Sequence, residues 1–119
     1  MVISPGDDDR IYAATRTGLW RSRNGGTSWQ QVLDPEVNGG CLDLELVADS
    51  SRDDLMVSCG TFTQATVYRN DSAGLAGSEY RPVLRDPGMG RTSVVVAPSQ
   101  PSTRYAISAS NLALSLIHI

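Results

Sequence analysis

The chain contains no lysine and few of the residues on which catalytic and metal sites depend. All ten basic residues are arginine, His118 is the only histidine, and two residues are cysteine. No Ser/His/Asp arrangement, cysteine-pair metal site, P-loop or dinucleotide-binding fingerprint is recognisable. The sequence therefore predicts neither a cofactor nor a bound metal. Exclusive use of arginine, with abundant Ala, Gly and Asp, is typical of a GC-rich, bacterial gene.

Long apolar runs and a basic stripe are also missing. No stretch approaches the roughly 18 apolar residues that a membrane helix needs, and no signal peptide is visible. The net charge of −3 argues against nucleic acid as a partner. What is present is an ordinary 40% of hydrophobic residues in 119, enough for the core of one small domain.

The two cysteines, Cys41 and Cys59, are too few to define a disulfide framework. We expect them on adjacent antiparallel strands but about three residues out of register, whereas a bridge needs Cα atoms within about 7 Å. Two buried thiols are therefore favoured over a disulfide, and the bridge stays open.

An internal repeat organises the chain. Two segments near the start recur without gaps 93 residues later, and a weaker copy lies between them. The equivalent segments are 3–5, 47–49 and 96–98, followed by 10–15, 54–59 and 103–108. Steps of 44 and 49 residues are within the range of one four-stranded propeller blade per repeat.

Alternating apolar residues bounded by turn residues predict an all-β fold of antiparallel four-stranded units, about two and a half of which are present. Expected strands cover 10–15, 19–22, 29–33, 41–48, 55–59, 66–70, 79–84, 92–97 and 104–108. The first unit spans about 1–34, the second about 41–84, and the start of a third about 91–111.

The segment 18–33 carries the most informative motif. It reads as a strand, a glycine turn and a second strand closed by tryptophan, with the spacing Ser22-x-Asn24-x-Gly26-x-Ser28-Trp29. This spacing resembles the Asp-box, or BNR repeat, of the β-propeller superfamily that includes sialidase, sortilin-type and xyloglucanase-type propellers. The second unit keeps a degenerate copy at 69–74, an insertion at 75–78, and Tyr80 roughly where the tryptophan would be.

The resemblance implies structural roles for the motif residues, on the outer rim and away from the central ligand site. Asn24-Gly25 favours a tight hairpin turn in which both central residues adopt positive φ. Ser22 and Asn24 would bond to turn backbone groups, and Gly26 would allow close chain approach. Trp29 would bury one face and keep its N–H for a partner, while Ser28 completes the motif.

Two carboxylates are the catalytic candidates. In the alternating stretch 41–46, Leu42, Leu44 and Leu46 face one way, and Asp43 and Glu45 the other. The innermost strand of a blade lines the central channel, so this pair could serve as acid and base of a glycoside hydrolase. The plainer reading is a pair facing a polar channel or an arginine of the next blade, since the third copy lacks it.

Other polar groups have plainer interpretations. Residues 7–9, three aspartates, suggest a cation site but are expected in a solvated turn. Residues 70–72 match a glycosylation sequon. Arg10, Arg16 and Arg104 could suggest the arginine triad of sialidases, but the Phe/Tyr-Arg-Ile-Pro motif is absent, which favours rim arginines or partners of nearby aspartates.

Both ends look truncated. Residues 114–119 match the translation of a transposase mosaic-end adapter and place an apolar run where a turn is due, so we expect non-native sequence there; an edge strand is the alternative. His118 lies in this tail. We also expect further blades, absent from this chain, to be needed to close the fold.

The resemblance therefore predicts a piece of an Asp-box propeller of six to ten blades, extracytoplasmic or secreted, that binds a protein or glycan without catalysis. The alternative is a sialidase-like or xyloglucanase-like glycoside hydrolase with most catalytic residues outside this chain. A WD-repeat protein is disfavoured because Gln30 follows Trp29 and no Gly-His signature is present.

Overall fold

The computed structural model describes residues 1–5, 7–34, 40–46, 53–61, 64–85, 90, 92–97, 100–109 and 114–118. These residues form eleven β-strands and no helix, which confirms the expected all-β class. Within them there is accordingly no helix that could cross a membrane.

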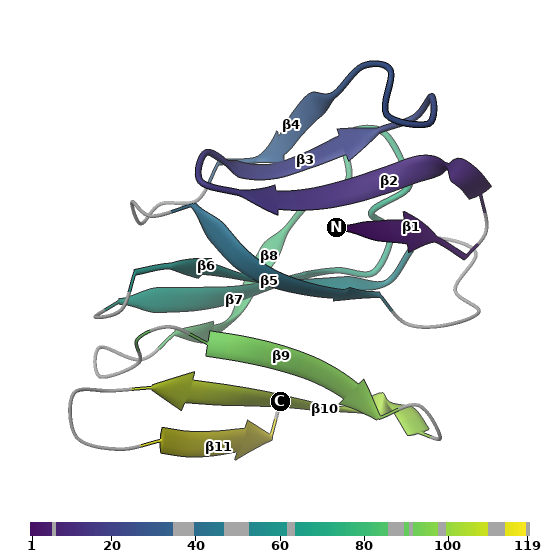
Figure 1. The fold of residues 1–119 in the computed structure, drawn as a ribbon. Coiled ribbons are helices and arrows are strands. Elements are labelled where there is room, and N and C mark those ends of the chain that lie inside the picture. The colour runs from purple at the N-terminus through teal and green to yellow at the C-terminus, as the bar shows by residue number, and fades with distance from the viewer. Residues whose placement is uncertain are drawn as a thin grey trace.

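The strands form three antiparallel sheets (Figure 1). The first sheet contains, in order, β1 (Val2–Ser4), β2 (Asp7–Thr15), β3 (Gly18–Ser22) and β4 (Gln30–Leu33). The second contains β5 (Cys41–Leu46), β6 (Leu55–Gly60), β7 (Ala65–Asn70) and β8 (Arg81–Arg85). The third contains β9 (Thr92–Ala97), β10 (Gln100–Ala109) and β11 (Leu114–His118), in the order β11-β10-β9. Each strand pairs with its chain neighbour, as short connections favour.

The internal repeat reappears in the strand pairing. Val2 lies opposite Tyr12 in the first sheet, and Val95 lies opposite Tyr105 in the third. Both members of the second pair stand 93 residues after their counterparts, the interval found in the sequence. The nine expected strands are found with boundaries within a few residues, whereas β1 was not expected, and positions 47–48 of one expected strand lie outside the described residues.

One expected turn is wrong. Asp7, Asp8 and Asp9 begin β2 as exposed strand residues, because a register shift after Ile3 lets the strand start early. Residues 114–118 form β11, which pairs with β10 from Ala109–Leu114 to Tyr105–His118. Pairing uses backbone groups that any extended apolar segment offers, so the adapter origin of this tail stays a prediction.

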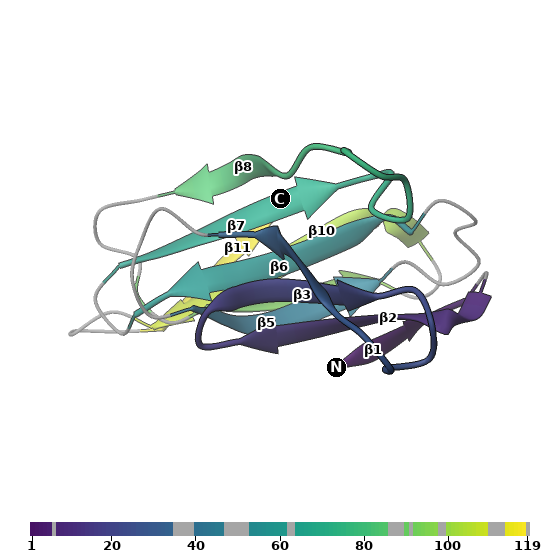
Figure 2. The ribbon, with the colours of Figure 1, turned by 90° about the horizontal axis from the view of Figure 1, so that it is seen from above.

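The three sheets lie one above another with their first strands on the same side (Figures 1 and 2). In Figure 2, β1 and β5 lie at one side of the molecule and β8 at the opposite side. β5 contacts β2 of the first sheet and β9 of the third. The second sheet is therefore covered on both faces, which is why β6 is buried along its whole length.

Two hydrophobic cores fill the spaces between the sheets. The first core lies between the first and second sheets and contains Tyr12, Leu19, Cys41, Leu44, Leu55, Val57, Cys59, Tyr68 and Ala73. The second core lies between the second and third sheets and contains Met56, Ala65, Val67, Val94 and Ala106. Successive residues of β6 alternate between the cores, because neighbouring side chains of a strand point to opposite faces.

Cys41 and Cys59 form a disulfide, which corrects the expectation of two free thiols. The two residues are direct partners in the pairing of β5 with β6. The sequence estimate assumed an unbroken register, but a bulge between Cys41 and Asp43 shifts it. The bridge thus joins β5 and β6, and both of its cysteines belong to the first core.

The same bulge changes which leucines share a face. Leu44 is buried in the first core and Leu46 packs against it. Leu42 is 37% exposed, so the expectation that it faces the same way as Leu44 is wrong. The extra residue of the bulge points Leu42 outward and leaves Cys41 inside.

A buried carboxylate connects the first two sheets. Asp53, fully buried, precedes β6 and accepts hydrogen bonds from the Ser4 hydroxyl at 2.5 Å, Arg10 Nε at 2.5 Å and the Tyr12 hydroxyl at 2.6 Å. Arg10 also donates to Ser4 at 3.1 Å. Burial, and then the bond to Asp53, raise the pKa of Tyr12, which stays protonated and donates. Three donors, one of them the cation Arg10, offset the cost of removing this charge from water.

The neighbouring Asp54 connects the second and third sheets. It pairs with Arg69 of β7 at 3.0 Å and with Arg104 of β10 at 2.5 Å. Burial alone would raise the pKa of Asp54, but the bonds from the two arginines outweigh it and the pKa lies below its ordinary value. Two consecutive aspartates therefore hold opposite neighbours of the second sheet.

We expect Asp53→Ala to lower the free energy of unfolding by about 3–5 kcal/mol, because Arg10 and two hydroxyls lose their shared acceptor. Urea denaturation followed by tryptophan fluorescence measures the loss. Asp8→Ala, at an exposed aspartate of the same chain, should change stability by no more than about 0.5 kcal/mol. Equal stabilities for the two variants would contradict the role assigned to Asp53.

The disulfide makes a separate prediction. The denatured, unreduced chain should not react with maleimide, whereas the reduced chain should gain two adducts by mass spectrometry. Reduction should lower the free energy of unfolding by about 3 kcal/mol, since the bridge closes a loop of moderate length. A Cys41→Ser, Cys59→Ser double variant should be insensitive to reductant; labelling of the unreduced wild-type chain would refute the bridge.

Candidate functional site

The turn between β3 and β4 is built on side chains of the sequence motif. Ser22 Oγ accepts the backbone N–H of Asn24 at 3.3 Å and of Gly26 at 2.8 Å. Asn24 Oδ1 accepts the N–H of Ser28 at 2.9 Å, and its Nδ2 donates to the Ser28 hydroxyl at 2.7 Å. Trp29 donates its indole N–H to the Gly26 carbonyl at 3.1 Å. All five motif residues thus take part in one hydrogen-bonded turn.

The turn differs from the expected tight hairpin. Seven residues separate β3 from β4, and positive φ occurs at Gly25 (70°) and Gly26 (95°), not at Asn24. Asn24 uses its side chain to order the turn and needs no left-handed backbone. Gly26 is required for its φ and not for close approach, since a Cβ there would be 3.8 Å from the Trp29 ring. Trp29 covers the turn but remains 38% exposed.

The degenerate copy in the second sheet forms an equivalent turn with other residues. Asn70 Oδ1 accepts the N–H of Ser72 and its Nδ2 donates to the Ser78 hydroxyl, both at 2.9 Å. The N–H of Ala73 bonds to the carbonyl of Asp53 at 3.0 Å, as that of Gly25 bonds to Asp9 at 2.9 Å. Asn70 is only 2% exposed, so the sequon presents no free amide for glycosylation in this fold.

The carboxylate pair lies on β5, beside the third sheet. Asp43 Oδ2 accepts the backbone N–H of Val94 in β9 at 2.9 Å. Glu45 is partly buried. Burial raises the pKa of Glu45, and the nearby charge of Asp43 raises it further. One member of the pair thus connects two sheets, and the other is harder to ionise than a free carboxyl group.

The remaining sequence candidates do not converge. Arg10 binds Asp53 and Arg104 binds Asp54, in different sheets, while Arg16 is exposed in the turn after β2. Arg10 and Arg104 thus serve as partners of aspartates, which is one of the plainer interpretations. Within the described part of the chain, no group of three His, Cys, Asp or Glu side chains could hold a metal ion.

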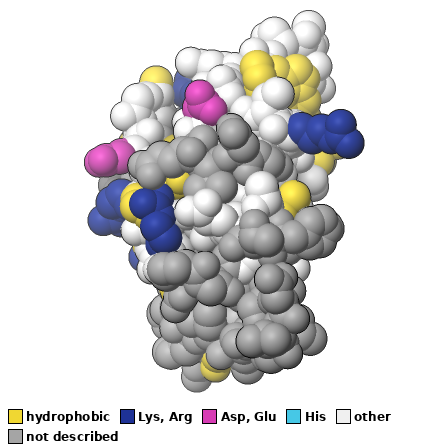
Figure 3. All heavy atoms as spheres, turned by 90° about the vertical axis from the view of Figure 1, so that its left-hand side faces the viewer, with side chains coloured by type: hydrophobic (Ala, Val, Ile, Leu, Met, Phe, Trp, Pro, Cys, Tyr) yellow, Lys and Arg dark blue, Asp and Glu magenta, His cyan; other side chains and the backbone are white. Residues whose placement is uncertain are grey.

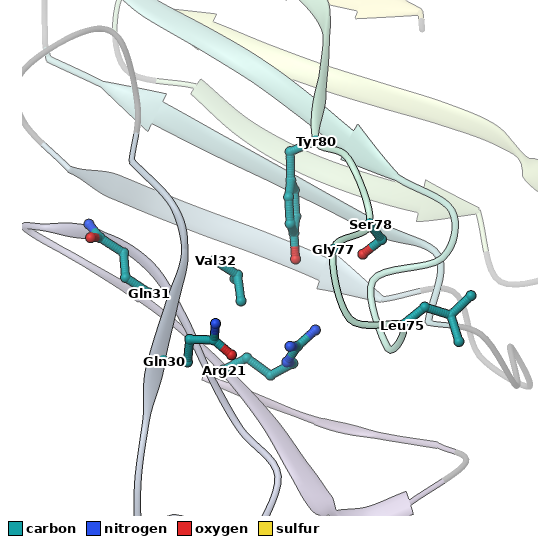
Figure 4. A pocket seen from close by; sticks show the side chains of 8 residues that line it. All are labelled: Arg21, Gln30, Gln31, Val32, Leu75, Gly77, Ser78 and Tyr80. Atoms are coloured by element: carbon teal, nitrogen blue, oxygen red, sulfur yellow. The ribbon is translucent and has the colours of Figure 1, made fainter.

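A cavity of about 150 Å³ lies between the first and second sheets, on the side of the glycine turns (Figure 4). The first sheet contributes Arg21, Gln30, Gln31 and Val32. The second contributes Leu75, Gly77, Ser78 and Tyr80, from the insertion in the degenerate turn and the residues that precede β8. In Figure 4, Arg21 and Tyr80 extend into the same space from opposite sides.

Arg21 is 4% exposed and lacks a carboxylate partner among the described residues. Its Nη1 donates to the carbonyl of Ala73 at 2.7 Å, but its Nε is buried without a hydrogen-bond partner. Burial lowers the pKa of Arg21, and repulsion from Arg23 lowers it further. A buried guanidinium with an unused N–H is costly, because no opposite charge offsets its loss of hydration.

Tyr80 supplies a second unsatisfied donor to the cavity. Its hydroxyl is buried and makes no hydrogen bond of normal geometry. The nearby side-chain amide of Asn70 acts to lower the pKa of this hydroxyl. Burial dominates and raises the pKa of Tyr80 to about 12, so the hydroxyl remains protonated at neutral pH. Of the three buried side-chain atoms without partners in the described residues, two therefore belong to this one cavity.

Sequence reasoning missed Arg21 and Asp53, although Arg21 left a signal. It stands two residues after Leu19, so the alternation of β3 places it on the same buried face. An arginine on an apolar face, with no acidic residue at the paired positions Tyr12 and Gln30, marks an unneutralised charge. Nothing comparable identified Asp53, whose partners are 41 to 49 residues away.

Charged side chains are mixed on the face that Figure 3 displays. Arginines occur there in separate places, and acidic side chains lie beside one of these groups. The arginines of the described residues thus form no continuous stripe on this face.

No protein-family model matches the chain, and the searches of curated proteins and of solved structures likewise find no significant similarity.

Replacing Ser22 tests the turn. Ser22→Ala removes the acceptor of two backbone N–H groups and should lower the free energy of unfolding by about 1–3 kcal/mol. Asn24→Asp keeps the oxygen that binds Ser28 and should cost less than about 0.5 kcal/mol. Thermal and urea denaturation compare the two; equal losses would show that the turn does not depend on Ser22.

Proposed function

We propose that the chain is part of an Asp-box β-propeller whose sheets are blades, and that this propeller is a non-catalytic binding or scaffold domain for protein or glycan partners. Three features support the propeller. The sheets recur at the interval of the sequence repeat, their first strands lie on one side, and two of them carry equivalent turns. A stack of antiparallel sheets arranged in this way suits radial closure by further blades.

One observation carries the non-catalytic assignment. The Asp43 carboxylate, one half of the candidate pair, accepts the backbone N–H of Val94 at 2.9 Å. A carboxylate that accepts a hydrogen bond from the backbone of a neighbouring sheet is fixed in place. This use is structural, and it leaves Glu45 without the free second carboxylate that glycoside hydrolysis requires.

The second candidate is a glycoside hydrolase, and one observation favours it. Glu45 has a raised pKa, which is the property of a general acid. In that case the partner carboxylate would come from outside this chain. Glu45 lies on β5, the first strand of the second sheet, which contacts the third sheet. This position is compatible with an acid that faces a central channel.

Two variants separate these functions. Asp43→Asn should lower the free energy of unfolding by about 1–2 kcal/mol, because a charged acceptor becomes neutral. Glu45→Gln should leave stability unchanged or slightly raised, because a partly buried charge is removed. Neither the wild-type chain nor either variant should hydrolyse a panel of fluorogenic glycosides, and binding to immobilised oligosaccharides, where present, should survive both changes.

The hydrolase predicts a different pattern. Wild-type turnover that disappears in Glu45→Gln, while the melting curve stays intact, would overturn the non-catalytic assignment. Retained turnover in Asp43→Asn would then identify Glu45 as the acid acting with a second group.

A further inference from the structure

The cavity between the first two sheets contains an unneutralised buried cation. The side chain of Arg21 enters it from β3, 4% exposed, anchored by one bond from Nη1 to the Ala73 carbonyl. Arg10 and Arg23 are close enough to repel it, and Arg10 is itself committed to Asp53. No carboxylate of the described residues pairs with Arg21, which favours an anion supplied from outside.

The guanidinium of Arg21 and the hydroxyl of Tyr80 are placed so that both can donate to one anion. The Nε–H of Arg21 and the adjacent Nη2 form the edge of a guanidinium that binds two oxygens of a planar anion side by side. The Tyr80 hydroxyl approaches from the opposite side as an unpaired donor (Figure 4). Val32 and Leu75 contribute apolar surface to the lining.

We propose that this cavity binds a carboxylate, held by the Nε edge of Arg21 and the hydroxyl of Tyr80. A carboxylate carries one charge, which matches the single unpaired arginine, and its flat pair of oxygens fits the guanidinium edge. A space of about 150 Å³ admits the carboxylate with a short aliphatic stem. The stem would lie against Val32.

The carboxylate can come from a free small acid or from an acidic side chain of a protein. Both present the same group to Arg21. No residue of β5, the strand of Asp43 and Glu45, lines the cavity. This inference is therefore independent of the proposed function, and each is tested by its own experiment.

The test uses the full chain and the side-chain Nε–H resonances of its arginines in ¹H–¹⁵N spectra. Two probes are titrated at constant ionic strength: propionate, and a blocked short peptide with one glutamate. Sodium chloride and the same peptide with glutamine are the matched controls. We expect the Arg21 Nε–H resonance to shift with at least one carboxylate probe, and not with the controls, while the Arg23 resonance moves less.

Variants locate the binding. Arg21→Met should weaken the responding probe at least about tenfold, since a charge-assisted pair is lost. Arg23→Met changes the net charge equally at an exposed arginine and should weaken it less than about twofold. Tyr80→Phe, which removes only the hydroxyl, should weaken binding several-fold and keeps the test decisive if Arg21→Met fails to fold.

The outcomes are distinct. A response to propionate indicates a small-acid site, and a response to the glutamate peptide alone indicates a protein-borne carboxylate. An Arg21 resonance that ignores both probes, or equal losses in Arg21→Met and Arg23→Met, would overturn the proposal.

Discussion

The assembly of this protein depends on the carboxylate of Asp53. It is fully buried, yet its three donors, Ser4, Arg10 and Tyr12, all come from the neighbouring sheet. A buried charge is tolerated only where donors surround it, so the first sheet must sit in one position relative to the second. Apolar packing between sheets is less directional. The ionic contact therefore fixes the alignment that the first hydrophobic core then fills.

The second sheet has two constraints at once. Its strand β6 sends alternate side chains into two cores, and the consecutive residues Asp53 and Asp54 bind arginines of opposite neighbours. The Cys41–Cys59 bridge closes the β5–β6 hairpin at the edge of one core. Both faces of this sheet are covered at β6, and the cavity lined by Arg21 and Tyr80 lies at the outer turn of the sheet.

The sequence predicted the strands well because alternation and turn residues are local signals. It also identified the motif residues of the turn, since Ser22 and Asn24 act on backbone groups within four residues. The disulfide escaped because one bulge changes a register that spacing alone treats as continuous. The Asp53 cluster and the Arg21 cavity escaped for a deeper reason: their members are distant along the chain, and only the stacking of sheets brings them together.

The degenerate turn has a consequence for how such repeats change over time. In the second sheet, Asn70 alone accepts the N–H of Ser72 and donates to the hydroxyl of Ser78. In the first sheet, Ser22 accepts the N–H of Asn24, and Asn24 donates to the hydroxyl of Ser28. In both copies the turn also donates a backbone N–H to a carbonyl near the start of the preceding strand, β2 or β6, and this bond survives because it uses only backbone atoms. Side chains in such a turn can therefore drift while its shape is inherited. A census of these repeats by consensus letters will count fewer units than the polypeptide contains.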